Sequence, residues 1–227
     1  MKALKFLAVA LITAAMLQAC SNPEGEKSET SEAKKAKNGE GITYTVNTDK
    51  STVKWLGSKP GGEHWGYVPV IDGKLMVHEG EITGGKFTLR VADLTVEDLE
   101  DPEMNAKLAG HLKTPDFFNT EEYPEITFEI SDIKPLDDKM TGDSMKLTHK
   151  ISGNLNIKDN VKNISFDANV KMMDGKIEAK SPQFLIDRTE WEIMYGSTAK
   201  KQNLGDKFKD NVVHDDIGLT IKLHASK

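Results

Sequence analysis

The sequence contains a single cysteine, Cys20, among its 227 residues. No disulfide can form within the chain, so a folded domain must be stabilised by its hydrophobic core. The length allows this, because a single domain of about 190 residues buries roughly 70% of the surface that its unfolded form exposes. A lone cysteine is expected either to remain a free thiol or to be modified covalently.

Positive charge is not in excess. The chain has 30 Lys and Arg residues against 36 Asp and Glu residues, which gives a formal net charge of −6. The basic residues do not gather into a stripe. An acidic chain of this kind argues against nucleic-acid binding and against electrostatic adhesion to anionic lipids.

Signatures of catalysis and of metal binding are also missing from the sequence. It has no Gly-x-Ser-x-Gly motif, no Walker-type phosphate loop and no His-Glu-x-x-His pair. The 6 histidines are scattered and lack the close spacing of metal ligands. Carboxylates are plentiful, so the sequence leaves a carboxylate-based hydrolase open, but nothing points towards one. We therefore expect a protein that is not an enzyme and that holds neither a metal nor a cofactor.

One long apolar run is present, from Phe6 to Leu17, with Thr13 as its only interruption. A run of about 12 residues is too short to cross a bilayer core of ~30 Å, which needs about 20 helical residues. Lys2 and Lys5 precede it, and a positive region followed by a short apolar run is typical of a signal peptide. We therefore predict that residues 1–19 are a signal peptide.

The apolar run leads into Leu17-Gln18-Ala19-Cys20, which resembles the lipobox of bacterial lipoproteins. The resemblance implies cleavage after Ala19 and attachment of a diacylglyceryl group to the Cys20 sulfur, which makes Cys20 a membrane anchor. The alternative is an ordinary signal peptide that leaves Cys20 as a free thiol. Ser21, rather than aspartate, follows the cysteine and favours the outer membrane over the inner one, with the domain on the periplasmic face.

The segment that follows Cys20 contains no large apolar side chain up to Glu40. Such a segment buries too little surface to offset the entropy that it loses on ordering. We predict that residues 20–40 form a lipidated, disordered tether with a span of roughly 25 Å. Residues 41–227 are then expected to form one domain.

Most of this domain alternates apolar and polar residues with a period of two. Phe87, Leu89 and Val91 show the pattern, with polar side chains between them. One apolar face and one polar face are typical of antiparallel strands. Similar alternating runs lie at residues 126–130, 147–157, 164–170, 184–186 and 217–223.

One segment departs from the alternation. Met104, Leu108 and Leu112 are four residues apart, which places them on one stripe of a helix. Asp101 can cap its first turn, and a second short helix or turn is expected near residues 189–195. About eight strands with so few helices favour a closed barrel or a two-sheet sandwich, and a closed barrel leaves no exposed strand edges. A barrel of this size either packs its own side chains or holds one slim ligand.

Two motifs resemble those of the YceI-like family. The first is His-Leu-Lys-Thr-Pro-Asp-Phe-Phe at residues 111–118, followed by Tyr-Pro and by a strand with Thr-Phe at residues 127–128. The second is Phe-Leu-Ile-Asp-Arg-Thr-Glu-Trp at residues 184–191. The likeness runs from about residue 42 to residue 225, although Glu192 and Asp159-Asn160 stand where the family often has glycine.

The resemblance implies an all-β fold, an extended antiparallel eight-stranded lipocalin-like barrel with one or two short helices and a long apolar tunnel. By this resemblance, the chain is expected to be like the characterised members of the family, which carry or bind polyisoprenoids, including isoprenoid quinones. The chain is accordingly expected to be a membrane-anchored lipoprotein that binds a long isoprenoid-type lipid in the tunnel, for carriage or storage at the cell envelope. Its expected partners are this lipid, the membrane that holds acylated Cys20 and, in a homodimer, a second copy of the chain.

Candidate ligand-binding residues are the side chains that the motifs and the inward strand faces carry. They are Phe117, Phe118, Phe128, His149, Phe166, Phe184, Arg188 and Trp191. Core packing is the alternative role for the aromatic residues and for His149. Arg188 follows an apolar strand, and a buried unpaired charge is costly. A partner is therefore expected for Arg188, such as Asp187, Asp116 or a ligand head group.

Two other functions stay open at this point. A barrel filled by its own side chains would be a structural or interaction protein of the envelope with no ligand. An enzyme that acts on a lipid head group would use His111, Asp116 or Arg188, and it would need a polar cluster with perturbed titration at one mouth of the barrel. A continuous apolar cavity through the barrel would favour the lipid-binding protein.

Overall fold

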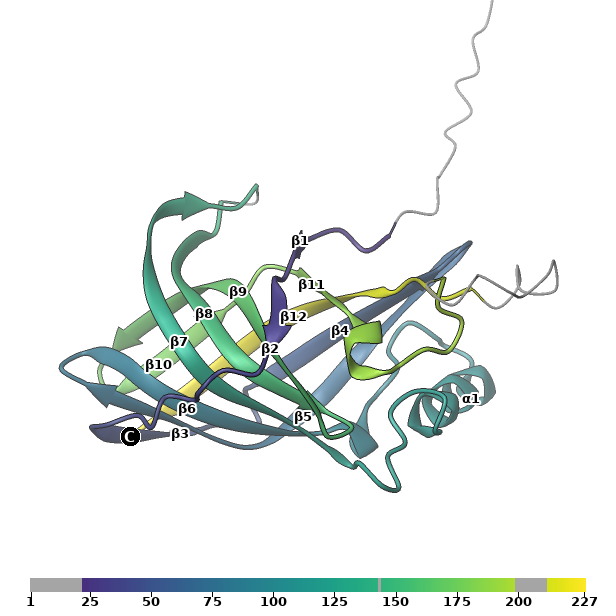
Figure 1. Ribbon diagram of the computed structural model, residues 1–227, viewed down its shortest axis with the longest axis horizontal. Helices are drawn as coiled ribbons and strands as arrows, with labels where there is room; N and C mark the ends of the chain where they lie inside the picture. The colour runs from purple at the N-terminus through teal and green to yellow at the C-terminus, as the bar shows by residue number, and fades with distance from the viewer. Residues whose placement is uncertain (1–21, 143, 199–211) are drawn as a thin grey trace, which may run out of the picture.

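The computed structural model describes residues 22–142, 144–198 and 212–227, and these form a β-barrel (Figure 1). The predicted signal peptide and Cys20, the predicted site of lipidation, lie outside the described residues. Within the described ranges, no helix is long and apolar enough to span a bilayer.

The described residues contain twelve strands, which build one sheet. They are β1 (Glu26–Lys27), β2 (Thr30–Glu32), β3 (Ile42–Val46), β4 (Thr52–Lys59), β5 (Gly62–His78), β6 (Glu81–Arg90), β7 (Glu125–Met140), β8 (Lys146–Ile157), β9 (Asn160–Met173), β10 (Lys176–Lys180), β11 (Phe184–Asp187) and β12 (Asp216–Ser226).

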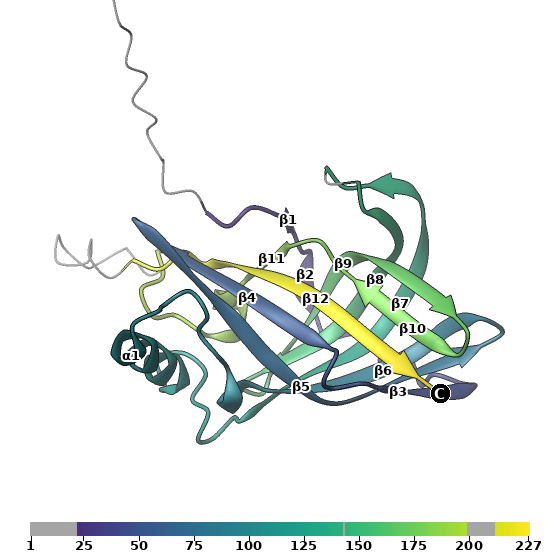
Figure 2. The same cartoon turned by 180° about the vertical axis from the view of Figure 1, so that it is seen from behind.

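A ring of eight strands closes the barrel. Strands β4 to β10 pair in chain order, and β12 pairs with both β10 and β4. Figure 2 shows β12 running between these two strands. Every pairing in the ring is antiparallel, so the predicted eight-stranded antiparallel barrel is confirmed.

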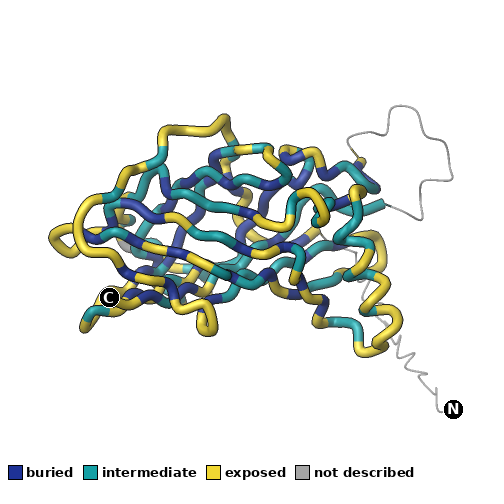
Figure 3. The backbone as a smooth tube through the Cα atoms, turned by 90° about the horizontal axis from the view of Figure 1, so that it is seen from below, coloured by how far each residue is buried: buried dark blue, intermediate teal, exposed yellow. Residues whose placement is uncertain are grey.

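Alternation along each strand separates the inside of the barrel from its outside. On β8, Leu147, Ile151 and Leu155 are buried, whereas Lys150 and Asn154 between them are only partly covered. Figure 3 shows the same alternation of buried and less buried residues along the other strands. The period of two in the sequence therefore marks the inward face, as predicted, and the inward side chains form the core.

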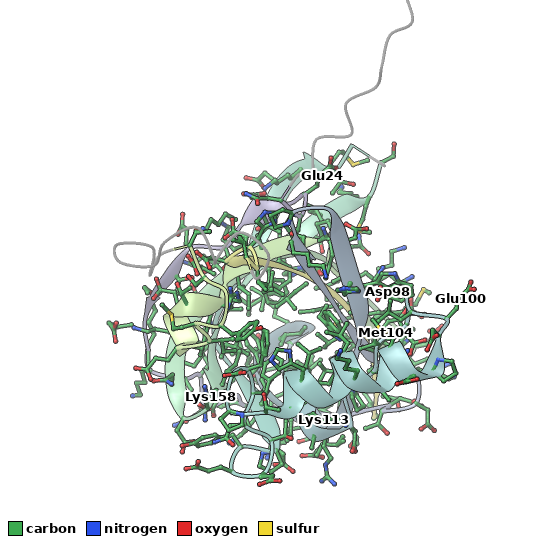
Figure 4. The ribbon with its side chains drawn as sticks, turned by 90° about the vertical axis from the view of Figure 1, so that its right-hand side faces the viewer. Glu24, Asp98, Glu100, Met104, Lys113 and Lys158 are labelled. Atoms are coloured by element: carbon green, nitrogen blue, oxygen red, sulfur yellow. The ribbon has the colours of Figure 1, made fainter. Side chains whose placement is uncertain are left out.

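The helix α1 (Pro102–Lys113) lies across one end of the barrel (Figures 1 and 4). The Asp101 carboxylate caps it by accepting hydrogen bonds from the backbone N–H groups of Glu103 and Met104, as predicted. None of its residues is fully buried. Two 3₁₀ helices accompany it: η1 (Val91–Asp93) and η2 (Arg188–Trp191), the latter where a second short helix was expected.

Residues 22–40 do not form the disordered tether that their composition predicts. β1 pairs in parallel with β11, and β2 pairs in antiparallel fashion with β9. Within the described residues β9 and β11 do not pair with each other. The segment at residues 24–32, here called the seam segment, therefore fills the gap between them. Residues 33–40 continue along the outside of the barrel, where the Lys37 N–H donates to the Ile130 carbonyl.

The seam segment is held by polar contacts rather than by apolar burial, which is why its composition did not predict its order. The Ser28 N–H donates to the Leu185 carbonyl at 2.8 Å. The Ser28 hydroxyl donates to the Ser165 carbonyl at 2.9 Å and accepts from the Ser165 N–H at 3.1 Å. Lys27 Nζ lies 2.7 Å from an Asp216 carboxylate oxygen. One serine thus joins the two strands on either side of the seam.

We predict that Ser28→Ala lowers the free energy of unfolding by about 1–3 kcal/mol, because it leaves the backbone N–H and C=O of Ser165 without their partner beneath the segment. Urea denaturation followed by tryptophan fluorescence measures the change. Ser31→Ala is the matched control, since Ser31 is exposed and surface substitutions of this kind stay within about 0.5 kcal/mol. Equal effects of the two variants would contradict the role given to Ser28.

Candidate functional site

A cavity with a volume of about 350 Å³ lies inside the barrel. Its walls are strands, and its rim includes Leu108 and His111 of α1 and Lys59 and His64 of the β4–β5 hairpin. The cavity therefore opens at the end of the barrel that α1 crosses, which Figure 4 views directly. Ligand pockets for small molecules have volumes of about 300–1,000 Å³.

A second cavity, of about 90 Å³, lies towards the opposite end of the barrel, where Leu75, Ile82 and Leu223 line it. No residue of α1 or of the tip of the β4–β5 hairpin lines it. The two cavities share part of their lining, namely Val53, Leu89, Phe128, Phe166 and Ile221. The interior thus holds two adjoining cavities, whereas the family resemblance implied one long tunnel.

Seven of the eight predicted ligand-binding residues line the larger cavity. They are Phe117, Phe118, Phe128, Phe166, Phe184, Arg188 and Trp191. His149 lines neither cavity. It lies half-buried on β8 with Nδ1 2.8 Å from the Thr148 hydroxyl, and burial lowers its pKa. Contact with a ligand stays a prediction for all eight residues.

The first family motif builds one side of the cavity mouth. The His111 ring packs edge-on against Phe117 and Tyr195, with centroid distances of 5.1 and 4.7 Å. His111 Nε2 lies 3.2 Å from an Asp116 carboxylate oxygen. These contacts join the end of α1 to the loop after η2, so the motif residues fix the edge of the opening.

Arg188 of the second motif is 3% exposed and holds the opposite wall in place. Its guanidinium nitrogens donate to the backbone carbonyls of Ile193, Val213 and His214 at 2.7, 3.0 and 3.0 Å. Its carboxylate partner is Asp215, at 3.3 Å, and neither Asp187 nor Asp116 as predicted. Burial lowers the pKa of Arg188, and the nearby Asp215 charge opposes this shift. Asp187 instead caps η2 by accepting from the backbone N–H of Thr189.

Trp191 is fully buried, and its indole N–H donates to the Leu155 carbonyl at 3.0 Å. The residue after it, Glu192, adopts a left-handed backbone conformation with φ 58° and ψ 26°. Glycine is the usual residue at such a helix end, which explains physically why the family often has glycine there. Glu192 is exposed and does not line either cavity.

A polar pair at the rim, His64 and Asp98, has no signal in the sequence. His64 Nδ1 lies 2.7 Å from Asp98 Oδ2, and the Trp65 N–H donates to Asp98 Oδ1 at 2.9 Å. Burial raises the pKa of Asp98, but the hydrogen bonds from Trp65 and His64 outweigh it, and the pKa is lowered overall. The pair lies 34 residues apart in the chain, so no local motif marks it. In the described part of the chain, no group of three or more His, Cys, Asp and Glu side chains is placed to hold a metal ion.

A closed barrel around an apolar cavity that opens at the α1 end defines a lipocalin-like class of fold. Within that class the chain belongs to the YceI-like domain family, whose model matches residues 44–225. The family that the two motifs indicated is thereby confirmed.

Solved structures that share this fold include the following two. BcnA of Burkholderia cenocepacia is 19% identical with a TM-score of 0.58, over 80% of this chain and 99% of that chain. A polyisoprenoid-binding domain from Saccharophagus degradans, implicated in plant cell wall breakdown, is 12% identical with a TM-score of 0.56, over 81% and 97%. No curated protein sequence matches the chain.

We predict that Asp98→Asn lowers the free energy of unfolding at pH 7 by about 1 kcal/mol, the typical net value of such a hydrogen bond. The folded pKa of Asp98 lies below its unfolded value, so its contribution is present above the unfolded pKa of about 3.9 and is lost as the pH falls through the folded pKa. Urea denaturation at pH 7 and below pH 4 should show the difference from wild type shrinking. Glu97→Gln, at an exposed neighbour, is the control, and a difference independent of pH would contradict the prediction.

Proposed function

We propose that this protein is a membrane-anchored lipoprotein that binds an isoprenoid-type lipid inside its barrel and carries or stores it at the cell envelope. The observation that carries the proposal is the apolar cavity of about 350 Å³ with a mouth at one end of the barrel. The ring of strands already forms its walls, so binding of a ligand requires little ordering of the protein. Membership of the YceI-like domain family supports the proposal, and so does the fold shared with a polyisoprenoid-binding domain.

The distribution of polar and apolar groups suits a lipid with a small head. Each CH₂ group that leaves water contributes about 0.8 kcal/mol, so an isoprenoid tail gains affinity along its whole buried length. Lys59, His64 and His111 stand at the rim of the cavity. A few polar groups at one end of an apolar pocket fix the orientation of a ligand. The tail is therefore proposed to lie inside and the head at the mouth.

The two alternatives have less support. A barrel filled by its own side chains would not leave a cavity of this volume. An enzyme that used Arg188 would need its guanidinium to face a substrate, whereas all three guanidinium nitrogens bond to backbone carbonyls or to Asp215. The other two groups that an enzyme would use, His111 and Asp116, lie within hydrogen-bonding distance of each other at the edge of the mouth.

We predict that Val68→Trp weakens isoprenoid binding at least tenfold, which corresponds to about 1.4 kcal/mol. Val68 is 7% exposed and lines only the larger cavity, so an indole there occupies the ligand's volume. The control is Val161→Trp, the same substitution on the outer face of β9, where the side chain is 38% exposed. Affinity is measured with an isoprenoid quinone by native mass spectrometry, after thermal melts establish that both variants fold.

If the purified wild-type protein neither carries nor takes up any isoprenoid, the proposed function is rejected. Equal binding by Val68→Trp and wild type would place the ligand outside the cavity and reject the proposed site.

We predict that Cys20→Ser abolishes membrane attachment, because the serine hydroxyl cannot replace the thiol that receives the lipid. Detergent phase partitioning of the protein expressed in a bacterial host measures this: wild type should enter the detergent phase and Cys20→Ser should not. Ser21→Ala is the control and should partition like wild type. A Cys20→Ser protein that is processed to its mature form and still partitions into detergent would overturn the anchor.

A further inference from the structure

A row of aromatic rings crosses the interior of the barrel. Phe87, Phe128, Phe166 and Phe184 stand on β6, β7, β9 and β11. Neighbouring ring centroids along the row lie 6.4, 5.9 and 4.6 Å apart. These separations are those of aromatic rings in mutual contact, and the last two rings are stacked with 5° between their planes. The row therefore behaves as one packed unit.

The row passes over β8, where Gly153 takes the place of a side chain. A Cβ atom at Gly153 would collide with Cζ of Phe128 and would lie 2.8 Å from the carbonyl oxygen of Glu129. The ring of Phe128 thus lies directly on the backbone of β8 and reaches Phe166 on the strand beyond. Glycine at position 153 is a steric requirement of this ring position.

The two cavities meet at this row. Phe128 and Phe166 line both cavities, while Phe184 lines only the larger one and Phe87 only the smaller one. The larger cavity holds the mouth. A lipid tail that enters through the mouth therefore meets the rings at the deep end of the larger cavity, before the smaller one.

We propose that this row of rings sets the maximum length of the isoprenoid chain that the barrel accepts, and that Phe128 is the residue that determines it. The inference rests on the proposed lipid-binding function and deepens it to a chain-length specificity. Each buried CH₂ group raises affinity about fourfold, so affinity grows while successive isoprene units enter the larger cavity. A unit beyond the row must separate packed rings or remain in water, and it adds no affinity.

Phe128 is the determining ring because of its position in the row and its exposure. Phe128 and Phe166 each contact a ring on either side and line both cavities. Phe128 is only partly buried, whereas Phe166 is 7% exposed, so Phe128 is the ring that presents more surface to the cavity. Its truncation opens the boundary between about 350 and about 90 Å³ of apolar space, which Phe166, Val53, Leu89 and Ile221 also line. Truncation of Phe118, which lines the larger cavity alone, enlarges the cavity near its mouth and leaves the row intact.

The experiment loads the full-length protein with an equimolar mixture of all-trans isoprenoid alcohols that differ by one isoprene unit, and native mass spectrometry reads the bound lengths. Wild type should show a limiting length. Phe128→Ala should raise that limit by at least one isoprene unit, and Phe128→Leu should give a smaller rise. Phe118→Ala, the matched control, should change occupancy at all lengths without moving the limit.

Ala168 supplies an independent check, because it lines only the smaller cavity. Ala168→Leu should leave the limit of the wild type unchanged, since the tail does not reach that cavity. Combined with Phe128→Ala, it should bring the limit back to the wild-type length. Both outcomes are expected if the row of rings sets the limit. Thermal melts of each variant establish that a change in overall stability is not the cause.

The outcomes separate the two levels of the proposal. Binding of isoprenoids with the same limit in wild type and in folded Phe128→Ala and Phe128→Leu proteins overturns the chain-length inference and leaves the lipid-binding function standing. A shift in the limit caused equally by Phe118→Ala also overturns it. Absence of binding at every length in the wild type rejects the proposed function and the inference with it.

Discussion

The pairing of β12 with strands from both halves of the chain is the constraint on which the rest of the structure depends. This last strand pairs with β3 and β4 on one side and with β10 and β11 on the other. Without it the sheet would be open, and its apolar face would lie in water. The pairing of Thr52 with Lys222 closes a very long loop, and its entropic cost has to be met before the core forms. The cavity exists only after this step.

Ring closure also fixes how much interior space the side chains can fill. An eight-stranded barrel is just wide enough to pack its own side chains or to hold one slim ligand. Here the row of aromatic rings takes up the middle of the barrel, and the space towards α1 stays open. Gly153 allows this packing because it has no side chain, and the ring of Phe128 lies where a side chain of β8 would otherwise stand. The boundary between the two cavities thus lies where these rings pack, together with the aliphatic side chains of Val53, Leu89 and Ile221.

The sequence predicts those features of the fold that apolar patterning controls. The alternation of Leu147, Ile151 and Leu155 with polar residues marks the inward face of β8, and Asp101 marks the start of α1. Order in the seam segment could not be predicted in this way. It depends on backbone pairing and on the two hydrogen bonds of Ser28 with Ser165, whose positions in the chain are 137 residues apart. Composition indicates how much apolar surface a segment can bury, but it does not indicate whether a polar segment pairs with a strand.

The candidate site likewise has some features that the sequence predicts and others that it does not. Inward aromatic residues such as Phe128 and Phe166 follow from strand alternation and line the cavity. The partner of Arg188 could not be inferred, because the choice of Asp215 depends on how the chain returns to the barrel at β12. The pairing of His64 with Asp98 likewise depends on a hairpin meeting a distant loop. Long-range polar contacts are set by the closed fold, and the sequence carries no local record of them.

The ordered seam segment changes the geometry that the proposed anchor allows. A disordered tether would let the barrel move some 25 Å from the membrane, whereas Pro23 is already buried and β1 begins at Glu26. Only Ser21 separates Cys20 from Asn22, so their Cα atoms lie at most about 7 Å apart. An acylated Cys20 would therefore hold the side of the barrel that carries β1 and β11 close to the lipid head groups. β11 leads directly into Arg188 and Trp191 in the cavity wall, so the anchor and the wall of the cavity share one strand.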